Sequence, residues 1–275
     1  MTIREEAFQG LPISCSIIDA HNHTGVTNSN GWHQNLKTVD TAEFVKDLDR
    51  LGIDCIISSN HLIGPGYMQQ ANAITASETA QFPGRVYGYI AIVPWCGIDE
   101  IREELKKYAQ HPGFVGLKLL AGYHGEIMQP EYEYAMDFAD EMGCPVLCHI
   151  WNNIPDRSGI PAALRTRHNM KFMVAHQGGG REKDTRAIVP VIRDHENAYM
   201  ELCGSLFNRI PVEGLAELVG VDKLIFGTDA IDLDAKFELG KVAFSPLDDD
   251  AKKKIFAENF LRISKDSQMG KIILS

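Results

Sequence analysis

The chain has 275 residues, of which 44% are hydrophobic and 23% are charged, the balance of an ordinary folded globular protein. It contains no apolar run of about 18 residues, and its polar start, MTIREEAFQG, lacks the apolar core of a secretory signal, so we expect a cytoplasmic protein without a membrane span. The formal net charge of −10 disfavours contact with phosphate backbones and therefore excludes nucleic acid as an expected partner.

Eight short runs rich in Val, Ile and Leu have the length and composition of buried strands. In chain order they are residues 17–18 leading to His21, then 55–59, 86–93, 114–119, 146–149, 172–176, 198–202 and 224–226. Stretches with helical periodicity lie between them at 41–51, 98–109, 131–142, 184–194 and 215–219. A last helix is predicted to start at the acidic run 248–250, because acidic side chains are favoured at a helix N-terminus.

This alternation of strands and helices predicts parallel βαβ units. Dividing 275 residues by eight units gives about 34 residues per unit, which fits one (β/α)8 TIM barrel of the α/β class over residues 1–275. An open doubly wound sheet is the alternative, but it would be expected to carry a glycine-rich fingerprint after its first strand. The first strand here ends in Asp19-Ala20-His21-Asn22-His23 instead.

The six cysteines are dispersed and most lie inside strand-like runs, so we expect buried free thiols rather than disulfides. Cys144 and Cys148 form a CxxxC pair. No second pair exists to complete a zinc site, which favours small core residues over metal ligands.

Five side chains that can bind metal fall at the predicted strand ends, where catalytic groups of TIM barrels lie. They are His21 and His23 on strand 1, His149 after strand 5, His176 after strand 6 and Asp229 after strand 8. Alone, each has an ordinary explanation as a hydrogen-bonded or capping residue. Together they would meet in one cavity, and this donor set suits a divalent ion such as Zn²⁺.

The sequence resembles the amidohydrolase superfamily, in its amidohydrolase-related (amidohydrolase 2) branch. The resemblance covers nearly the whole chain and rests on DAHNH, GFVGLKLL, VLCHI, VAHQGG, FGTDA and the closing AENFLRIS. It implies that His21, His23, His149 and Asp229 bind a catalytic metal and that His176 is a further ligand or contacts the substrate. It also implies that one ion is favoured and that two are possible, in which case Lys118 on strand 4 is the candidate bridge after reaction with carbon dioxide.

Lys118 lies within the apolar run 115–120, where an unpaired ammonium would cost several kcal/mol. Three interpretations follow: a carboxylated bridge, a cation that holds a substrate carboxylate, or a residue beyond the rim without a role. We favour a substrate-binding or supporting role, because this branch more often resembles enzymes with one metal.

Loop residues after the strands are candidates for substrate binding. Gly178-Gly179-Gly180 can expose backbone N–H groups to an anion, and Arg181 can add a carboxylate contact, with a flexible turn and a surface arginine as the equal alternative. Further candidates at strand ends are Trp151 and His124, and more weakly His61, Tyr123, Asn152 and Glu201. Trp32-His33 could belong to a lid.

The main functional prediction is a metal-dependent hydrolase that opens an amide, lactone or ester bond of a small molecule with a metal-activated water. Asp229 would take the proton of that water and pass it to the leaving group, and His176 would stabilise the oxyanion or position the carbonyl. The alternative is a non-oxidative decarboxylase of a small aromatic or unsaturated acid at the same site. A metal-dependent deoxyribonuclease or phosphoesterase fits less well because that group usually carries Glu where Lys118 stands. A non-enzymatic scaffold would not need the complete ligand set. A homodimer is left open.

Overall fold

The computed structural model describes residues 1–25, 40–151, 159–179, 181–204 and 210–274. Eight strands pair in parallel in the order of the sequence. Their bounds are β1 (Ile18–Thr24), β2 (Cys55–Asn60), β3 (Val86–Ile92), β4 (Phe114–Leu119), β5 (Pro145–Cys148), β6 (Lys171–Val174), β7 (Ala198–Glu201) and β8 (Leu224–Ile225). The sheet closes because Ala20 N–H donates to Phe226 O over 3.1 Å and Asp229 N–H donates to His21 O over 2.7 Å. The predicted TIM barrel is therefore confirmed.

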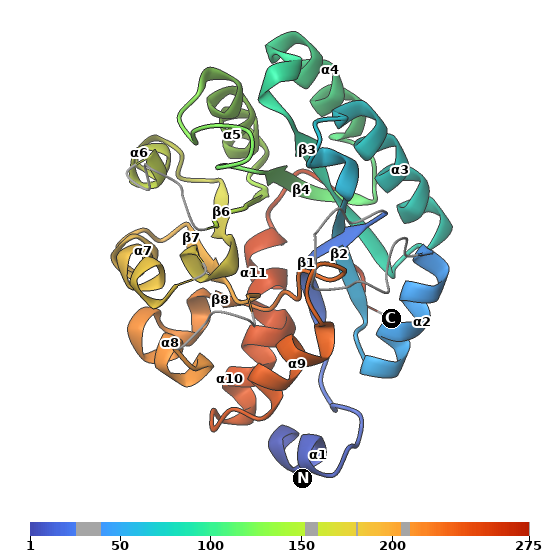
Figure 1. The fold of residues 1–275 in the computed structure, drawn as a ribbon, viewed down its shortest axis with the longest axis vertical. Coiled ribbons are helices and arrows are strands. Elements are labelled where there is room, and N and C mark those ends of the chain that lie inside the picture. The colour runs from blue at the N-terminus through green and yellow to red at the C-terminus, as the bar shows by residue number, and fades with distance from the viewer. Residues whose placement is uncertain (26–39, 152–158, 180, 205–209, 275) are drawn as a thin grey trace.

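Helices surround the strands (Figure 1). Their bounds are α1 (Ile3–Phe8), α2 (Thr41–Leu51), α3 (Met68–Gln81), α4 (Ile98–Tyr108), α5 (Pro130–Met142), α6 (Gly159–Thr166), α7 (Glu182–Asp194), α8 (Val212–Val219), α9 (Ala235–Ala243), α10 (Asp249–Lys253) and α11 (Asn259–Ser264). A π-helical turn (Lys254–Glu258) joins α10 to α11. Asp248 caps α10 through its side chain, which accepts from Ala251 N over 2.8 Å, so the predicted acidic helix start is confirmed.

The sequence patterns missed α1, α3, α6 and α9. The physical reason is clearest for α3, whose buried face is largely polar and therefore lacks an apolar period. The Asn72 amide bonds the backbone of Ala91 in both directions, donating to O over 3.2 Å and accepting from N over 2.7 Å. It also donates to Glu104 over 2.8 Å. Hydrogen bonds thus hold α3 against β3 where an apolar stripe would normally do so.

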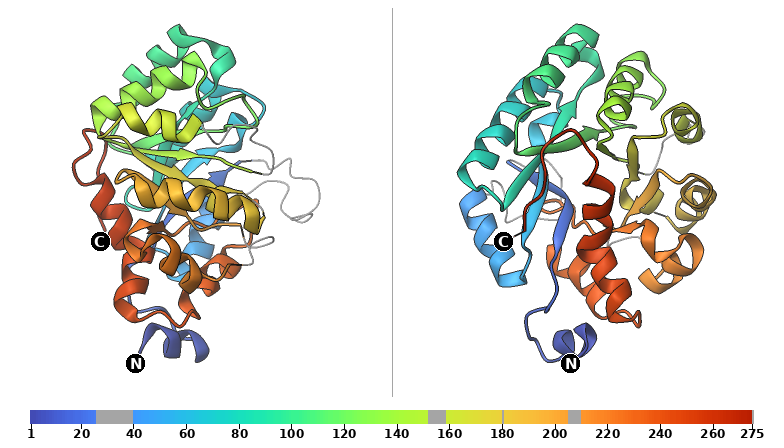
Figure 2. Two further views of the ribbon diagram at one scale, coloured as in Figure 1. Left: turned by 90° about the vertical axis from the view of Figure 1, so that its left-hand side faces the viewer. Right: turned by 180° about the vertical axis from the view of Figure 1, so that it is seen from behind.

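Two apolar cores lie on either side of the strands. One fills the space between the strands and the outer helices. The other fills the barrel interior with inward side chains such as Ile57, Tyr89 and Leu147, and is joined by Phe260 and Ile263 of α11. Seen from behind, α11 and the C-terminal segment lie across the end of the barrel at which the strands begin (Figure 2).

All six cysteines are free thiols, and four of them are buried, as expected. Among the described residues, none of the helices combines the length and the apolar character that crossing a membrane requires.

Candidate metal centre and active site

A bulge in β1 turns two histidines toward the barrel axis. Ala20 packs in the barrel interior. The pairing with β2 then shifts between Asp19 and Asn22, where β1 contains one residue more than its partner. Such an extra residue reverses the inward and outward alternation of the residues that follow. His21 and His23 therefore both reach Asp229 across the seam of the barrel.

His21, His23 and Asp229 form a cluster with the spacing of metal ligands. Asp229 Oδ1 lies 3.1 Å from His21 Nε2 and 3.3 Å from His23 Nε2. Ligands about 2.0–2.1 Å from a tetrahedral Zn²⁺ stand about 3.3 Å apart, so the separations fit. Asp229 takes a left-handed backbone conformation with φ of 55°, which a non-glycine residue adopts only when its surroundings impose it.

Hydrogen bonds fix which nitrogen of each imidazole faces the cluster. His21 Nδ1 lies 2.9 Å from a carboxylate oxygen of Glu201. His23 Nδ1 lies 2.9 Å from the backbone oxygen of Ser59. Both partners accept, so both Nδ1 atoms carry the proton and both Nε2 lone pairs face Asp229. This arrangement, in which an outer acceptor orients the ring, is typical of metal-binding histidines.

His149 and His176 form the adjoining part of the site. His176 Nε2 lies 2.8 Å from His149 Nδ1, and His176 Nδ1 lies 3.8 Å from Asp229 Oδ2. His149 Nε2 is covered and has no hydrogen-bond partner among the described residues. A buried nitrogen without a partner is costly, and a metal ligand bond would satisfy it. Of the five predicted ligands, His21, His23 and Asp229 stand at mutual ligand spacing, whereas His176 adjoins Asp229 and His149 adjoins His176.

Lys118 extends into the barrel interior behind these ligands. Its side chain is fully buried, and Nζ lies 2.6 Å from His21 Nε2. Burial lowers the pKa of Lys118, while the charges of Asp229 and Glu201 oppose the shift. Lys118 is not among the residues that line the cavity described below.

The imidazoles of the site are held neutral. Burial lowers the pKa of His149 to about 3 and lowers the pKa values of His21, His23 and His176 well below the usual range. Neutral imidazole is the form that binds a metal. Burial also raises the pKa of Asp229 well above its ordinary value, an effect that the nearby Lys118 charge opposes.

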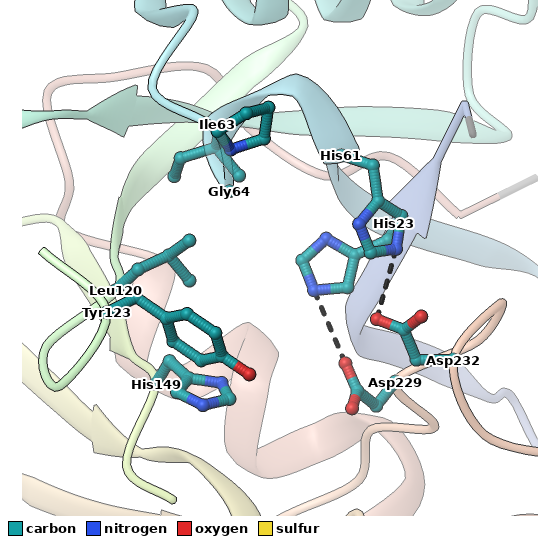
Figure 3. Close-up of a pocket in the computed structure, with 10 residues that line it drawn as sticks. His23, His61, Ile63, Gly64, Leu120, Tyr123, His149, Asp229 and Asp232 are labelled. Atoms are coloured by element: carbon teal, nitrogen blue, oxygen red, sulfur yellow. Dashed lines mark ion pairs between the residues drawn. The ribbon is translucent and has the colours of Figure 1, made fainter. Parts of the chain in front are cut away.

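A cavity of about 400 Å³ opens onto the cluster. His23, His61, Asp229 and Asp232 form one wall, and Leu120 and Tyr123 lie across from them (Figure 3). Ile63, Gly64, Pro65 and His149 complete the lining. This volume suits a small organic molecule with one apolar face and one polar edge.

The remaining predicted residues lie at the edge of the site or behind it. His124 is buried outside the cavity lining, with Nε2 3.1 Å from Gly64 O and its ring 4.3 Å from that of Trp95. Trp151 packs edge to face on His176 with ring centroids 5.0 Å apart. Arg181 donates to Asp184 over 2.6 Å and is also outside the lining. Trp32, His33, Asn152 and Gly180 fall outside the described residues.

A family model of amidohydrolases matches residues 18–263, a span that includes every ligand candidate. The chain belongs to the amidohydrolase family. The comparison with curated proteins found no match to this chain in sequence.

Solved structures of similar fold include three enzymes. A 2,6-dihydroxybenzoate decarboxylase from Rhizobium has a TM-score of 0.73 at 15% identity, covering 91% of this chain and 99% of its own. A 5-carboxyvanillate decarboxylase from Novosphingobium aromaticivorans, complexed with manganese and a nitrobenzoic acid, has a TM-score of 0.73 at 13% identity, covering 92% and 96%. A 4-oxalomesaconate hydratase from Rhodopseudomonas palustris has a TM-score of 0.62 at 15% identity, covering 91% and 96%. At these identities the likeness concerns the fold.

Sequence reasoning missed or undervalued three residues of the site. Asp232 lines the cavity and pairs with His61 over 3.0 Å, although only its position three residues after Asp229 could have suggested this. Glu201 was expected at most to line the pocket, yet it is fully buried beneath His21. Cys203 was taken as a core residue, but its sulfur lies 3.0 Å from His176 Nδ1.

Proposed function

We propose that the protein is a metal-dependent, non-oxidative decarboxylase of a small aromatic or unsaturated carboxylic acid. The observation that carries this proposal is the two-sided cavity of about 400 Å³, in which Leu120 and Tyr123 face the histidine and aspartate wall. A flat unsaturated ring fits against the apolar side while its acidic groups meet the polar side. Two of the solved structures with TM-scores of 0.73 are decarboxylases of such acids, which supports the proposal.

We assign the metal to His21, His23 and Asp229, with His149 Nε2 as a further ligand. A bound divalent ion would supply positive charge that polarises the acid. Zinc, as one ion, remains our proposal from the donor types; manganese is present in the 5-carboxyvanillate decarboxylase structure. Two ions with a carboxylated Lys118 are the alternative stoichiometry.

In the proposed reaction, the carboxylate leaves the substrate as carbon dioxide and a proton takes its place on the carbon. The bond to the carboxylate breaks, its electron pair stays on the carbon, and a proton is added there. Asp229 lies at the cavity wall and is the residue placed to pass that proton to the carbon. Solvent entering the cavity would reprotonate it. His176 lies outside the cavity lining and adjoins Asp229, with its Nδ1 3.8 Å from Asp229 Oδ2.

Hydrolysis is the second candidate. It is favoured by the same Asp229, whose Oδ2 faces His176 and lies at the cavity wall, where it could take a proton from an attacking water. The two reactions share the site but differ in their products.

A panel assay separates them. The zinc-loaded and manganese-loaded enzymes are offered carboxyl-labelled aromatic and unsaturated acids, and in parallel lactones, esters and amides of similar size. Release of labelled carbon dioxide that is lost in Asp229→Asn and kept in the surface variant Asp266→Asn supports decarboxylation. Turnover of the lactones, esters or amides alone would replace it by hydrolysis.

A further inference from the structure

Glu201, the last residue of β7, receives an unusual number of hydrogen bonds. Its Oε2 lies 2.9 Å from His21 Nδ1, 2.9 Å from Cys203 Sγ and 3.1 Å from the backbone N of His176. Its Oε1 accepts the backbone N–H of Cys203 over 2.6 Å. The side chain is fully buried. Every described partner of this carboxylate can donate a proton, and both of its oxygens accept a backbone N–H group.

The contacts of Glu201 decide the direction of its hydrogen bond with Cys203. One backbone N–H group donates to each oxygen, as to a carboxylate, and a carboxylate only accepts, so the Cys203 thiol donates its proton to Glu201. The sulfur can then act only as an acceptor toward His176 Nδ1, 3.0 Å away.

The same direction continues along the two neighbouring rings. If His176 carries its proton on Nδ1, then His176 Nε2 is unprotonated and accepts the Nδ1–H of His149 over 2.8 Å. His149 Nε2 is then also bare, which agrees with the absence of any hydrogen-bond partner for it among the described residues. The opposite direction would bury an N–H at that atom without an acceptor, at a cost of about 1–3 kcal/mol.

We infer that Glu201 is a positioning residue that sets the tautomers of three histidines at once. It acts directly on His21 and, through the thiol of Cys203, on His176 and then His149. As a result, Nε2 is unprotonated on both His21 and His149. This inference rests on the proposed metal site for its purpose, but the tautomers themselves are properties of the chain.

A second use of the same atoms is a closed metal site, because His21, His176, Glu201 and Cys203 offer ligand atoms that lie close together. The backbone N–H groups of His176 and Cys203 also point at Glu201, however, and a hydrogen-bonded carboxylate uses them where a metal would not. We therefore favour the relay, meaning the hydrogen bonds from Glu201 through Cys203 to His176 and His149. The closed metal site is an alternative outcome of the test.

The test compares Cys203→Ser, which can both donate and accept, with Cys203→Ala, which can do neither. Cys144→Ala removes another fully buried thiol and is the matched control. Histidine tautomers are read from long-range proton–nitrogen spectra of the full-length protein labelled with ¹⁵N-histidine, both zinc-loaded and chelator-treated. Zinc affinity and stoichiometry are measured by competition with a chromophoric chelator.

We expect the Nδ1–H form at His21, His149 and His176 in the unaltered chain, in Cys203→Ser and in Cys144→Ala. In Cys203→Ala, His149 and His176 should lose the fixed tautomer while His21 keeps it, and zinc binding should weaken about tenfold. Glu201→Gln should disturb all three rings and weaken zinc binding by about 10–100-fold, the usual effect of removing an outer partner of a metal ligand. Glu104→Gln, which alters a buried carboxylate on α4, is its control.

Three results have distinct meanings. An Nε2–H form at His149 or His176 in the unaltered chain, or a Cys203→Ala protein identical to Cys144→Ala, would overturn the relay. The loss of one of two zinc ions in Cys203→Ala would replace it by the closed metal site. If the tautomers are as expected but the unaltered chain binds neither zinc nor manganese, the relay stands and the proposed function fails.

Discussion

Lys118→Met should strengthen metal binding. The substitution keeps an unbranched side chain of similar length in a fully buried position and removes the ammonium that lies 2.6 Å from His21 Nε2. That nitrogen is a proposed metal ligand, so the metal must displace the lysine. A hydrogen bond to a charged group contributes about 1.5–3 kcal/mol, which corresponds to about 10–100-fold in a dissociation constant.

The assay measures zinc and manganese dissociation constants by chelator competition, with thermal unfolding of the same samples. Lys252→Met is the matched control, because Lys252 is also fully buried and its Nζ donates to the backbone oxygen of Ala243 over 3.0 Å. We expect about 10–100-fold tighter binding in Lys118→Met and no change in metal affinity in Lys252→Met.

Two results would refute this reasoning. Weaker binding or the loss of one of two ions, together with a carbon dioxide adduct on Lys118 in the native mass spectrum, would make the lysine a bridge. A raised KM with unchanged metal affinity would make it a substrate ligand.

Three further changes test the site and the packing around it. Asp229→Asn should lower turnover at least about 100-fold, and an enzyme that keeps its rate would remove Asp229 from the proton transfer. Burial lowers the pKa of His149 to about 3 in the folded chain, whereas an unfolded histidine takes up a proton below about pH 6.5. The free energy of unfolding should therefore be unaffected by His149 above pH 6.5 and should fall progressively as the pH is lowered from 6.5 toward 3. Urea unfolding at a series of pH values should show this slope, and His149→Gln should reduce it. Gly227→Ala should destabilise the fold by about 1–3 kcal/mol in urea unfolding, because a Cβ there would collide with the Glu201 carboxylate, whereas Gly240→Ala, which makes only an ordinary contact with Phe244, should not.

The barrel and the positions of its candidate ligand residues could be predicted because both follow local rules. Buried parallel strands are apolar on both faces, so each run was visible, and the ends of such strands meet at one rim of a barrel. His21, His23, His149, His176 and Asp229 could be placed for that reason alone.

What escaped prediction depends on contacts between distant segments. The bulge that turns His21 inward appears only in the pairing of β1 with β2. The second wall of the cavity comes from loops whose course no periodicity encodes, so Tyr123 was only a weaker candidate and Leu120 was assigned to an apolar run. Glu201 and Cys203 resemble ordinary strand-end residues until β7 is brought beside His21 and His176.

The segment that lies across the far end of the barrel also bears on how the chain is made. Gly270 N–H donates to Phe114 O over 2.9 Å, Ile273 N–H donates to Tyr87 Oη over 3.0 Å, and Ile272 packs against the interior core. Because β1 to β8 precede these residues in the chain, the inner apolar core is covered at this end only after residues 270–273 have been synthesised. Until then, chaperones that bind exposed apolar surface would have access to the core from this end.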